Sequence, residues 1–297
     1  MILVTGATGN VGGNLVRLLA DAGTQVRALT RDPDRAAFPA GVTAVTGDLN
    51  QPESLSAALA GVSGVFLLPG YRDMPGVLAE IRRAGVGQVV LLSSSAVPGG
   101  EMSNAITRYM MMSEAAVRDS GVPWTVLRPV GFMSNALQWA PQLRAGEVVR
   151  APFAGVRRAL IDPYDIAAVA ARALLKEEHQ GHSYVLTGPE SLLPADQVRV
   201  LAAVLGRGLR FEAQPDAEAR AEMRTTMPAE YVEAFFRYFA DGTLDDSTVY
   251  PTVEELTGTP PRTFQQWATA HASAFRLERS PSSRSGYLTI RTPVQSS

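Results

Sequence analysis

The sequence contains no cysteine among its 297 residues. This absence excludes disulfides, thiolate metal sites and a cysteine nucleophile. The three histidines, His179, His182 and His271, lack a metal-binding spacing with nearby acidic residues. No apolar run approaches membrane-spanning length, and the first residues lead directly into an apolar strand. We therefore expect a soluble, cytoplasmic protein without a signal peptide.

The chain also lacks a large excess of charge of either sign. Its formal net charge is −2 at pH 7 and no basic stripe stands out, so nucleic acid is not favoured as a partner. Lysine occurs once, at Lys176, beside abundant arginine, a bias associated with GC-rich bacterial genomes. Hydrophobic residues make up 46% of the chain, enough for a sizeable core. These features indicate a globular protein whose partner is a small molecule. They are compatible with a homo-oligomer and do not define its size.

The first turn of the chain carries three glycines. Gly6, Gly9 and Gly12 stand between an apolar run that ends at Thr5 and a stretch with apolar residues at helical spacing. Strand, glycine turn and helix in this order predict a dinucleotide site, because small residues let the backbone approach a pyrophosphate at a helix N-terminus. The alternative is a tight turn without a ligand. The predicted contacts from this turn are Gly6, Thr8, Gly9, Asn10, Val11 and Gly12.

Strand-like and helix-like stretches alternate over the first half of the chain. This alternation predicts an α/β fold, a Rossmann-type doubly wound parallel sheet, in which ligands lie beyond the carboxyl ends of the strands. The predicted strands are 2–5, 25–30, 42–45, 64–70, 88–95 and 123–129, with helices at 74–84 and 104–120. Four further cofactor contacts are expected at the strand ends: Leu49, Leu68, Pro69 and Ser93.

The residues after the second strand indicate which nicotinamide cofactor is used. A carboxylate is expected there for a free ribose 2′-hydroxyl, but the strand ends at Thr30 and Arg31 follows. A guanidinium can hold a 2′-phosphate, so we predict NADPH rather than NADH. Alternatively, Arg31 is a solvated charge and Asp32 takes the acidic role. After the third strand, Asp48 either faces the adenine amino group or caps a turn.

Five segments of the chain form a recognisable set: Thr5–Gly12, Thr30–Pro33, Ser120–Pro129, Ile161–Ala167 and Thr259–Trp267. Together they resemble the NmrA-like atypical short-chain dehydrogenase/reductases. The resemblance covers roughly residues 1–276, and that family includes bacterial NADPH-dependent quinone reductases and redox-sensing regulators. It implies a Rossmann-type domain and a smaller substrate lobe from the C-terminal half.

We accordingly expect two domains and a tail. The dinucleotide-binding domain comprises residues 1–130, and residues 160–187 return to it. The substrate lobe, mainly helical, comprises 131–159 and 188–276, with helices over 188–207, 229–239 and 263–275. Residues 277–297 turn to Ser, Arg and Pro without a helical pattern, which indicates a mobile tail or a partner-contacting arm.

The chain departs from the usual Tyr-x-x-x-Lys pair of short-chain dehydrogenases. Tyr109 is followed four residues later by Ser113, which has no charge to lower the pKa of the tyrosine. Tyr109 is either a hydrogen-bond donor to the substrate or a half-buried helix residue. Ser94, at the end of the fifth strand, is the best-placed hydroxyl donor, or else bonds backbone in its turn. Apolar walls for a flat substrate, or ordinary core positions, are Met112, Phe132, Met133 and Trp139.

Without the lysine, hydride addition to a quinone is easier than alcohol oxidation, because the product anion takes its proton from water. We predict an NADPH-dependent reductase of a quinone or a similar flat aromatic acceptor. It could serve aromatic polyketide tailoring, where the reduced quinone reacts with oxygen and becomes hydroxylated. A second hypothesis is a redox sensor that binds NADP(H) and reports to a protein partner. A third is a reductase of an imine, an azo compound or an enone.

Overall fold

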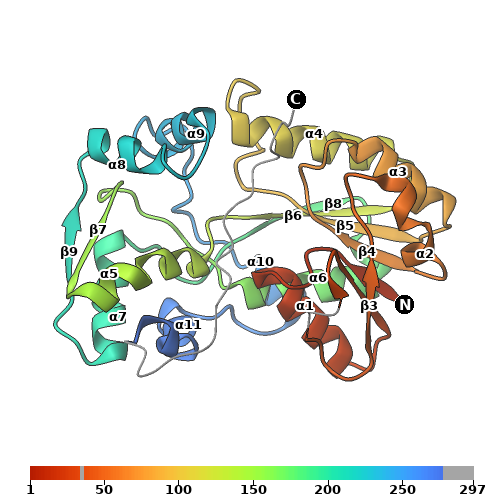
Figure 1. Cartoon of the computed structure of the whole chain (residues 1–297), viewed down its shortest axis with the longest axis horizontal. Coiled ribbons are helices and arrows are strands. Elements are labelled where there is room, and N and C mark those ends of the chain that lie inside the picture. The colour runs from red at the N-terminus through yellow and green to blue at the C-terminus, as the bar shows by residue number, and fades with distance from the viewer. Residues whose placement is uncertain (34–36, 277–297) are drawn as a thin grey trace. The chain divides into compact units, whose positions relative to one another are not determined.

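The computed structural model describes residues 1–33 and 37–276, so the predicted tail at 277–297 lies outside the described residues. Contacts divide the chain into two units (Figure 1). The sheet unit comprises Met1–Pro129, Pro163–Leu186 and Thr252–Pro260. The second unit comprises Val130–Asp162, Thr187–Pro251 and, among the described residues, 261–276.

A parallel sheet forms the centre of the sheet unit. In the described part of the chain it has seven strands in the order β3-β2-β1-β4-β5-β6-β8, and each neighbouring pair is parallel. Chain order reverses at β1, which places the carboxyl ends of β1 and β4 side by side. The predicted Rossmann-type sheet is confirmed. Its strands are β1 (Ile2–Val4), β2 (Val26–Thr30), β3 (Val42–Thr46), β4 (Gly64–Leu67), β5 (Gln88–Leu92), β6 (Trp124–Pro129) and β8 (His182–Leu186).

Helices cover both faces of this sheet. In Figure 1, α3 and α4 lie on one side, and α1 and α6 lie on the other. Every residue of β4 and β5 is buried as a result, which is why both segments are rich in apolar residues without alternation. The helices of this unit are α1 (Asn10–Asp21), α2 (Ser56–Leu59), α3 (Met74–Arg83), α4 (Ala105–Asp119), α6 (Pro163–Leu175) and α10 (Thr252–Thr257).

Two parts of the sheet unit differ from the sequence analysis. No strand was predicted at β8, because an edge strand that is mostly exposed or half-buried lacks a continuous apolar run. Residues 252–260 were assigned to the substrate lobe, whereas α10 packs on α6 and β8 and buries Val253 in the sheet unit.

The second unit is mainly helical, in agreement with the predicted architecture. A small parallel sheet of β7 (Val148–Ala151) and β9 (Arg210–Ala213), which was not predicted, also belongs to it. Its largest core cluster gathers apolar side chains around the fully buried Trp267. Its helices are α5 (Ala140–Ala145), α7 (Pro194–Leu205), α8 (Asp216–Met223), α9 (Ala229–Phe239) and α11 (Phe264–Ala270), with short 3-10 helices at Met133–Trp139 and Ala272–Phe275.

Candidate functional site

The turn between β1 and α1 has the backbone geometry that its glycines predict. Gly6 has a φ of +59°, and the N–H of Gly9 donates to the Gly6 oxygen over 2.9 Å. A methyl group on Gly12 would lie 2.2 Å from that oxygen, so a larger residue would push α1 away from the turn. Gly9 precedes α1 without a side-chain cap. The first N–H groups of α1 therefore suit a pyrophosphate as acceptor, and the residues present fit a dinucleotide.

Other predicted contacts surround this turn. Thr8 and Asn10 are exposed, whereas Val11 is 4% exposed, so Val11 has only its backbone N–H to offer a phosphate. The loop after β4 closes on the turn, because the N–H of Leu68 donates to the Thr5 hydroxyl over 3.1 Å. Half-buried Leu68 and Pro69 are therefore placed beside the glycines. Leu49 is 7% exposed and belongs to the sheet core.

Arg31 and Asp48 follow neighbouring strands at the same edge of the sheet. Arg31 is exposed at the end of β2, where the Thr30 hydroxyl accepts the N–H of Asp32 over 3.2 Å. This bond uses only the backbone of Asp32, so the choice between Arg31 and Asp32 as the group that meets the ribose stays a prediction. Asp48 accepts the N–H of Asn50 over 2.9 Å, the turn-capping role that the sequence left open. A role of Asp48 toward adenine stays a prediction.

Tyr71, which the sequence analysis missed, is within reach of the charges of both residues. Burial raises the pKa of Tyr71 to about 12, and the charges of Arg31 and Asp48 act on it in opposite directions. The next residue, Arg72, donates its N–H to the Asn50 side chain over 3.5 Å, which ties the loop after β4 to the loop after β3. Tyr71 thus keeps a protonated hydroxyl near Arg31. A single loop tyrosine has no spacing that could have identified it.

Ser93 has a structural partner instead of an open hydroxyl. It is 4% exposed and donates to Glu114 over 2.6 Å. Arg128 binds the same carboxylate through two hydrogen bonds of 2.9 and 2.7 Å, and Arg118 adds one of 2.8 Å. Burial raises the pKa of Glu114, but these bonds and charges outweigh it and hold the pKa below its usual value. Because the Ser93 O–H is used in this bond, the Ser93 hydroxyl can meet a cofactor only as an acceptor.

The residue at the usual lysine position is also structural. Ser113 is 1% exposed, accepts the N–H of Gly70 over 3.0 Å and donates to the Tyr109 carbonyl over 2.8 Å. The ring of Tyr109 lies against Gly70 and is half-buried. The Ser94 hydroxyl accepts the N–H of Ala96 over 3.2 Å, its expected turn role. As an acceptor there, Ser94 still has its own O–H to donate.

The four predicted substrate walls divide into different environments. Met133 and Trp139 are 1% and 4% exposed in the core cluster of the second unit, so packing alone explains both. Phe132 is half-buried, while Met112 on α4 is 59% exposed. Substrate contact of these four residues stays a prediction, and the core positions of Met133 and Trp139 correspond to the alternative stated for them.

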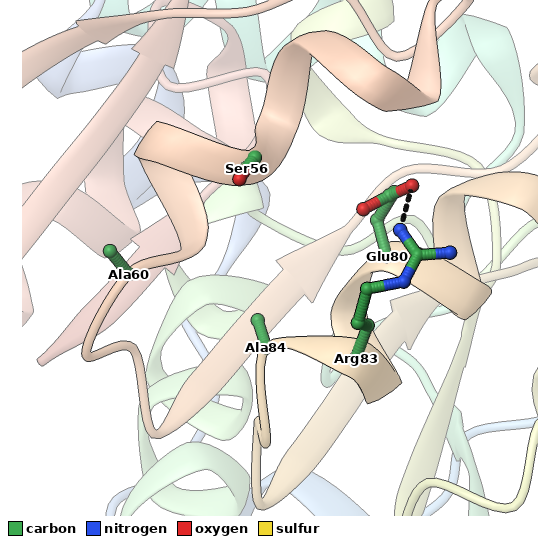
Figure 2. A pocket seen from close by; sticks show the side chains of 5 residues that line it. All are labelled: Ser56, Ala60, Glu80, Arg83 and Ala84. Atoms are coloured by element: carbon green, nitrogen blue, oxygen red, sulfur yellow. Dashed lines mark hydrogen bonds and ion pairs between the residues drawn. The ribbon is translucent and has the colours of Figure 1, made fainter.

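A hollow on the sheet unit lies away from these residues. Figure 2 shows its lining by Ser56, Ala60, Glu80, Arg83 and Ala84, with an ion pair between Glu80 and Arg83. Ala60 and Ala84 precede β4 and β5, so the hollow lies at the amino ends of the strands. The glycine turn and Arg31 lie at the carboxyl ends. This hollow is therefore not the dinucleotide site.

Within residues 1–33 and 37–276, we find no group of three or more acidic or histidine side chains that could hold a metal ion. Over the same residues, we find no helix with the length and apolar character to cross a membrane.

Comparisons with known proteins agree with this geometry. Residues 6–177 match a family model described as NAD(P)H-binding. A (4-alkanoyl-5-oxo-2,5-dihydrofuran-3-yl)methyl phosphate reductase from Streptomyces griseus is 44% identical, covering 94% of this chain and 100% of its own. An NAD(P)H azoreductase from Xenophilus azovorans is 36% identical, covering 93% and 99%. The crystal structure of an NADPH-dependent quinone oxidoreductase from Escherichia coli has a TM-score of 0.77 at 24% identity, covering 92% of this chain and 100% of that one. The last match confirms the fold.

Proposed function

We propose that this chain uses NADPH to reduce a quinone or another flat, electron-poor acceptor. The chain belongs to the NAD(P)H-binding family and is an NAD(P)H-dependent oxidoreductase. The observation that carries the proposal is buried Ser113 at the position of the usual lysine. Alcohol oxidation lacks an activated tyrosine here. Reduction of a quinone needs no such base, since the delocalised product anion takes its proton from water.

The names of two relatives support the same class of acceptor. One reduces a ring with an oxo group and a conjugated alkanoyl group, and the other is named for azo compounds. Quinones, unsaturated carbonyl compounds and azo compounds share a polarised double bond in a flat conjugated system. Hydride addition to any of them spreads the negative charge onto oxygen or nitrogen, so one or two hydrogen-bond donors are sufficient.

In this proposal, the chain's own residues bind and orient the cofactor and the acceptor. The turn from Gly6 to Gly12 and the N-terminus of α1 hold the pyrophosphate, and Arg31 holds the ribose 2′-phosphate. Ser94, whose O–H is not used in accepting the Ala96 N–H, donates to the acceptor oxygen. Tyr109 serves as a second donor or as a wall. When bound, NADPH supplies the hydride.

The finer proposal concerns the use of the product. A reduced polycyclic quinone can react with oxygen and become hydroxylated, a step that suits aromatic polyketide tailoring. The arginine-rich composition and the Streptomyces relative are compatible with this use.

The test is NADPH oxidation without oxygen against a panel of naphthoquinones, anthraquinones, an azo dye and an unsaturated lactone, with NADH as control. We expect stoichiometric consumption with at least one acceptor, and a hydroxylated product when a reactive quinone is used in air. Tight NADPH binding without consumption of any acceptor would overturn the reductase proposal. That outcome would favour the redox-sensor alternative and a protein partner.

Arg31→Asp is expected to reverse the cofactor preference. The substitution removes a charge-assisted contact to the 2′-phosphate and adds a repulsive carboxylate, so the Kd for NADPH should rise about a hundredfold. The Kd for NADH should change by less than about threefold, because NADH has no phosphate at this position. Titration of both cofactors by intrinsic fluorescence measures the two values. Equal losses for NADPH and NADH would contradict the 2′-phosphate role.

A further inference from the structure

Arg158 lies in the second unit, where its backbone pairs with the backbone of Leu192. Its N–H and carbonyl bond Leu192 over 3.1 and 3.0 Å, and the N–H of Ala159 donates to the Asp246 carbonyl over 2.6 Å. Three residues after Arg158, Ile161 pairs with Phe132, one of the predicted substrate walls. These bonds fix the backbone from which the Arg158 side chain extends.

The guanidinium of Arg158 lies 4.9 Å from the ring centre of Phe239, a cation–π contact. Burial lowers the pKa of Arg158, and the charge of buried Asp246 opposes this effect. Within residues 1–33 and 37–276, nothing accepts a hydrogen bond from this guanidinium. By contrast, Arg150 of the same unit binds Glu218 through two bonds of 2.8 Å. A half-buried arginine with five N–H donors and no protein acceptor is suited to an anionic ligand.

Aromatic rings stand beside this arginine. Phe153 lies 5.3 Å from Phe239 and 5.0 Å from Phe236, measured between ring centres. Among the described residues, Phe153 is the one non-glycine residue with a positive φ, at 58°. Such backbone strain gathers at ligand sites, where the surrounding structure maintains it. Arg158, Phe153 and Phe239 are each half-buried, so solvent or a ligand can reach them.

We propose that Arg158 binds an anionic oxygen group of the acceptor, with the rings of Phe153 and Phe239 beside the flat part of the same molecule. The proposal rests on the proposed function, because it defines the substrate class of that reductase as a conjugated acceptor that carries a negative charge. Phosphate, carboxylate and sulfonate groups all present the oxygens that a guanidinium fork can bind.

The test compares a naphthoquinone that carries one sulfonate group with the parent naphthoquinone, in the wild-type enzyme and in Arg158→Met. Arg158→Met should raise the KM for the sulfonated quinone about tenfold or more, and that for the parent by less than about twofold. Arg158→Lys should recover part of the loss through its charge. Arg199→Met is the matched control, because Arg199 is 76% exposed and its replacement removes the same charge from the same unit.

A second measurement separates this proposal from the proposed function. Binding of a naphthalene sulfonate and of an uncharged naphthalene alcohol is titrated in the presence of NADP, which requires no turnover. We expect only the sulfonate to weaken in Arg158→Met, again about tenfold. Equal effects on both compounds, or none on the sulfonate in a folded variant, would overturn the anion site. If no quinone is reduced but Arg158→Met still weakens binding of the sulfonate alone, the proposed function fails and the anion site stands.

Discussion

Replacing Gly12 by alanine is expected to abolish useful NADPH binding while Gly13→Ala leaves it intact. The methyl group at position 12 would lie 2.2 Å from the Gly6 oxygen and 2.7 Å from the Gly6 carbonyl carbon, and both are backbone atoms. Because neither can rotate away, α1 must shift relative to the turn. Overpacking of this kind lowers the free energy of unfolding by about 1–3 kcal/mol. The same shift misplaces the N–H groups offered to the pyrophosphate.

The matched control is the next residue in the same helix. A methyl group on Gly13 would lie 3.4 Å from the Ala7 oxygen, an ordinary contact, and alanine is favoured over glycine inside a helix by up to about 1 kcal/mol. We expect the Kd for NADPH to rise about a hundredfold in Gly12→Ala and to change by less than about twofold in Gly13→Ala. Fluorescence titration and thermal unfolding measure both. Unchanged NADPH affinity in folded Gly12→Ala would refute the proposed position of the pyrophosphate.

The second large effect is expected at Glu114. Glu114→Gln keeps the shape of the side chain but removes the charge that balances Arg128 and, in part, Arg118. Breaking a buried ion pair by removing one partner costs about 3–5 kcal/mol, because the remaining charge is left in a poorly solvated place. Glu80→Gln is the control, since Glu80 pairs with Arg83 and Arg83 is 69% exposed. Such a surface pair contributes about 0–1 kcal/mol. Urea unfolding at neutral pH distinguishes the two variants.

The low pKa of Glu114 also predicts the pH dependence of its contribution. The carboxyl ionises more readily in the folded chain than in the unfolded chain, where its pKa returns to the usual range of a glutamate. Its stabilisation is therefore present above the unfolded pKa and is lost as the pH falls through the lower, folded pKa. The difference in unfolding free energy between the wild type and Glu114→Gln should shrink below about pH 4. A difference that stays constant as the pH is lowered from neutral into the acid range would show that charge is not the cause.

The fold and the pyrophosphate turn could be predicted because their signals are local. Gly6, Gly9 and Gly12 lie within one short segment, and their steric role follows from their spacing. Likewise, Arg31 stands directly after a strand, so its edge of the sheet follows from the alternation of strands and helices. The helix at 229–239 was predicted with the observed bounds because its apolar residues recur at helical spacing.

Other features could be predicted only in part, because a helical pattern tells which residues share a face but not what that face meets. Met112, Met133 and Trp139 were equally plausible as substrate walls, yet Met112 is exposed and the other two are core residues. Residues 252–260 lack a long apolar run, and their place on α6 depends on contacts made far away along the chain.

The sequence by itself determined the parallel sheet, the glycine turn, the basic residue at the end of β2 and the missing lysine. Only the tertiary structure decided that Glu114 joins Ser93 and Arg128, which are 21 and 14 residues away, and that Tyr71 lies near Arg31. It likewise decided that Arg158 lies over Phe239 without an acceptor in the described part of the chain. The physical reason is that turn geometry depends on sterics between close neighbours in sequence, whereas the pairing of a buried charge depends on which distant side chains the fold brings within a few ångströms.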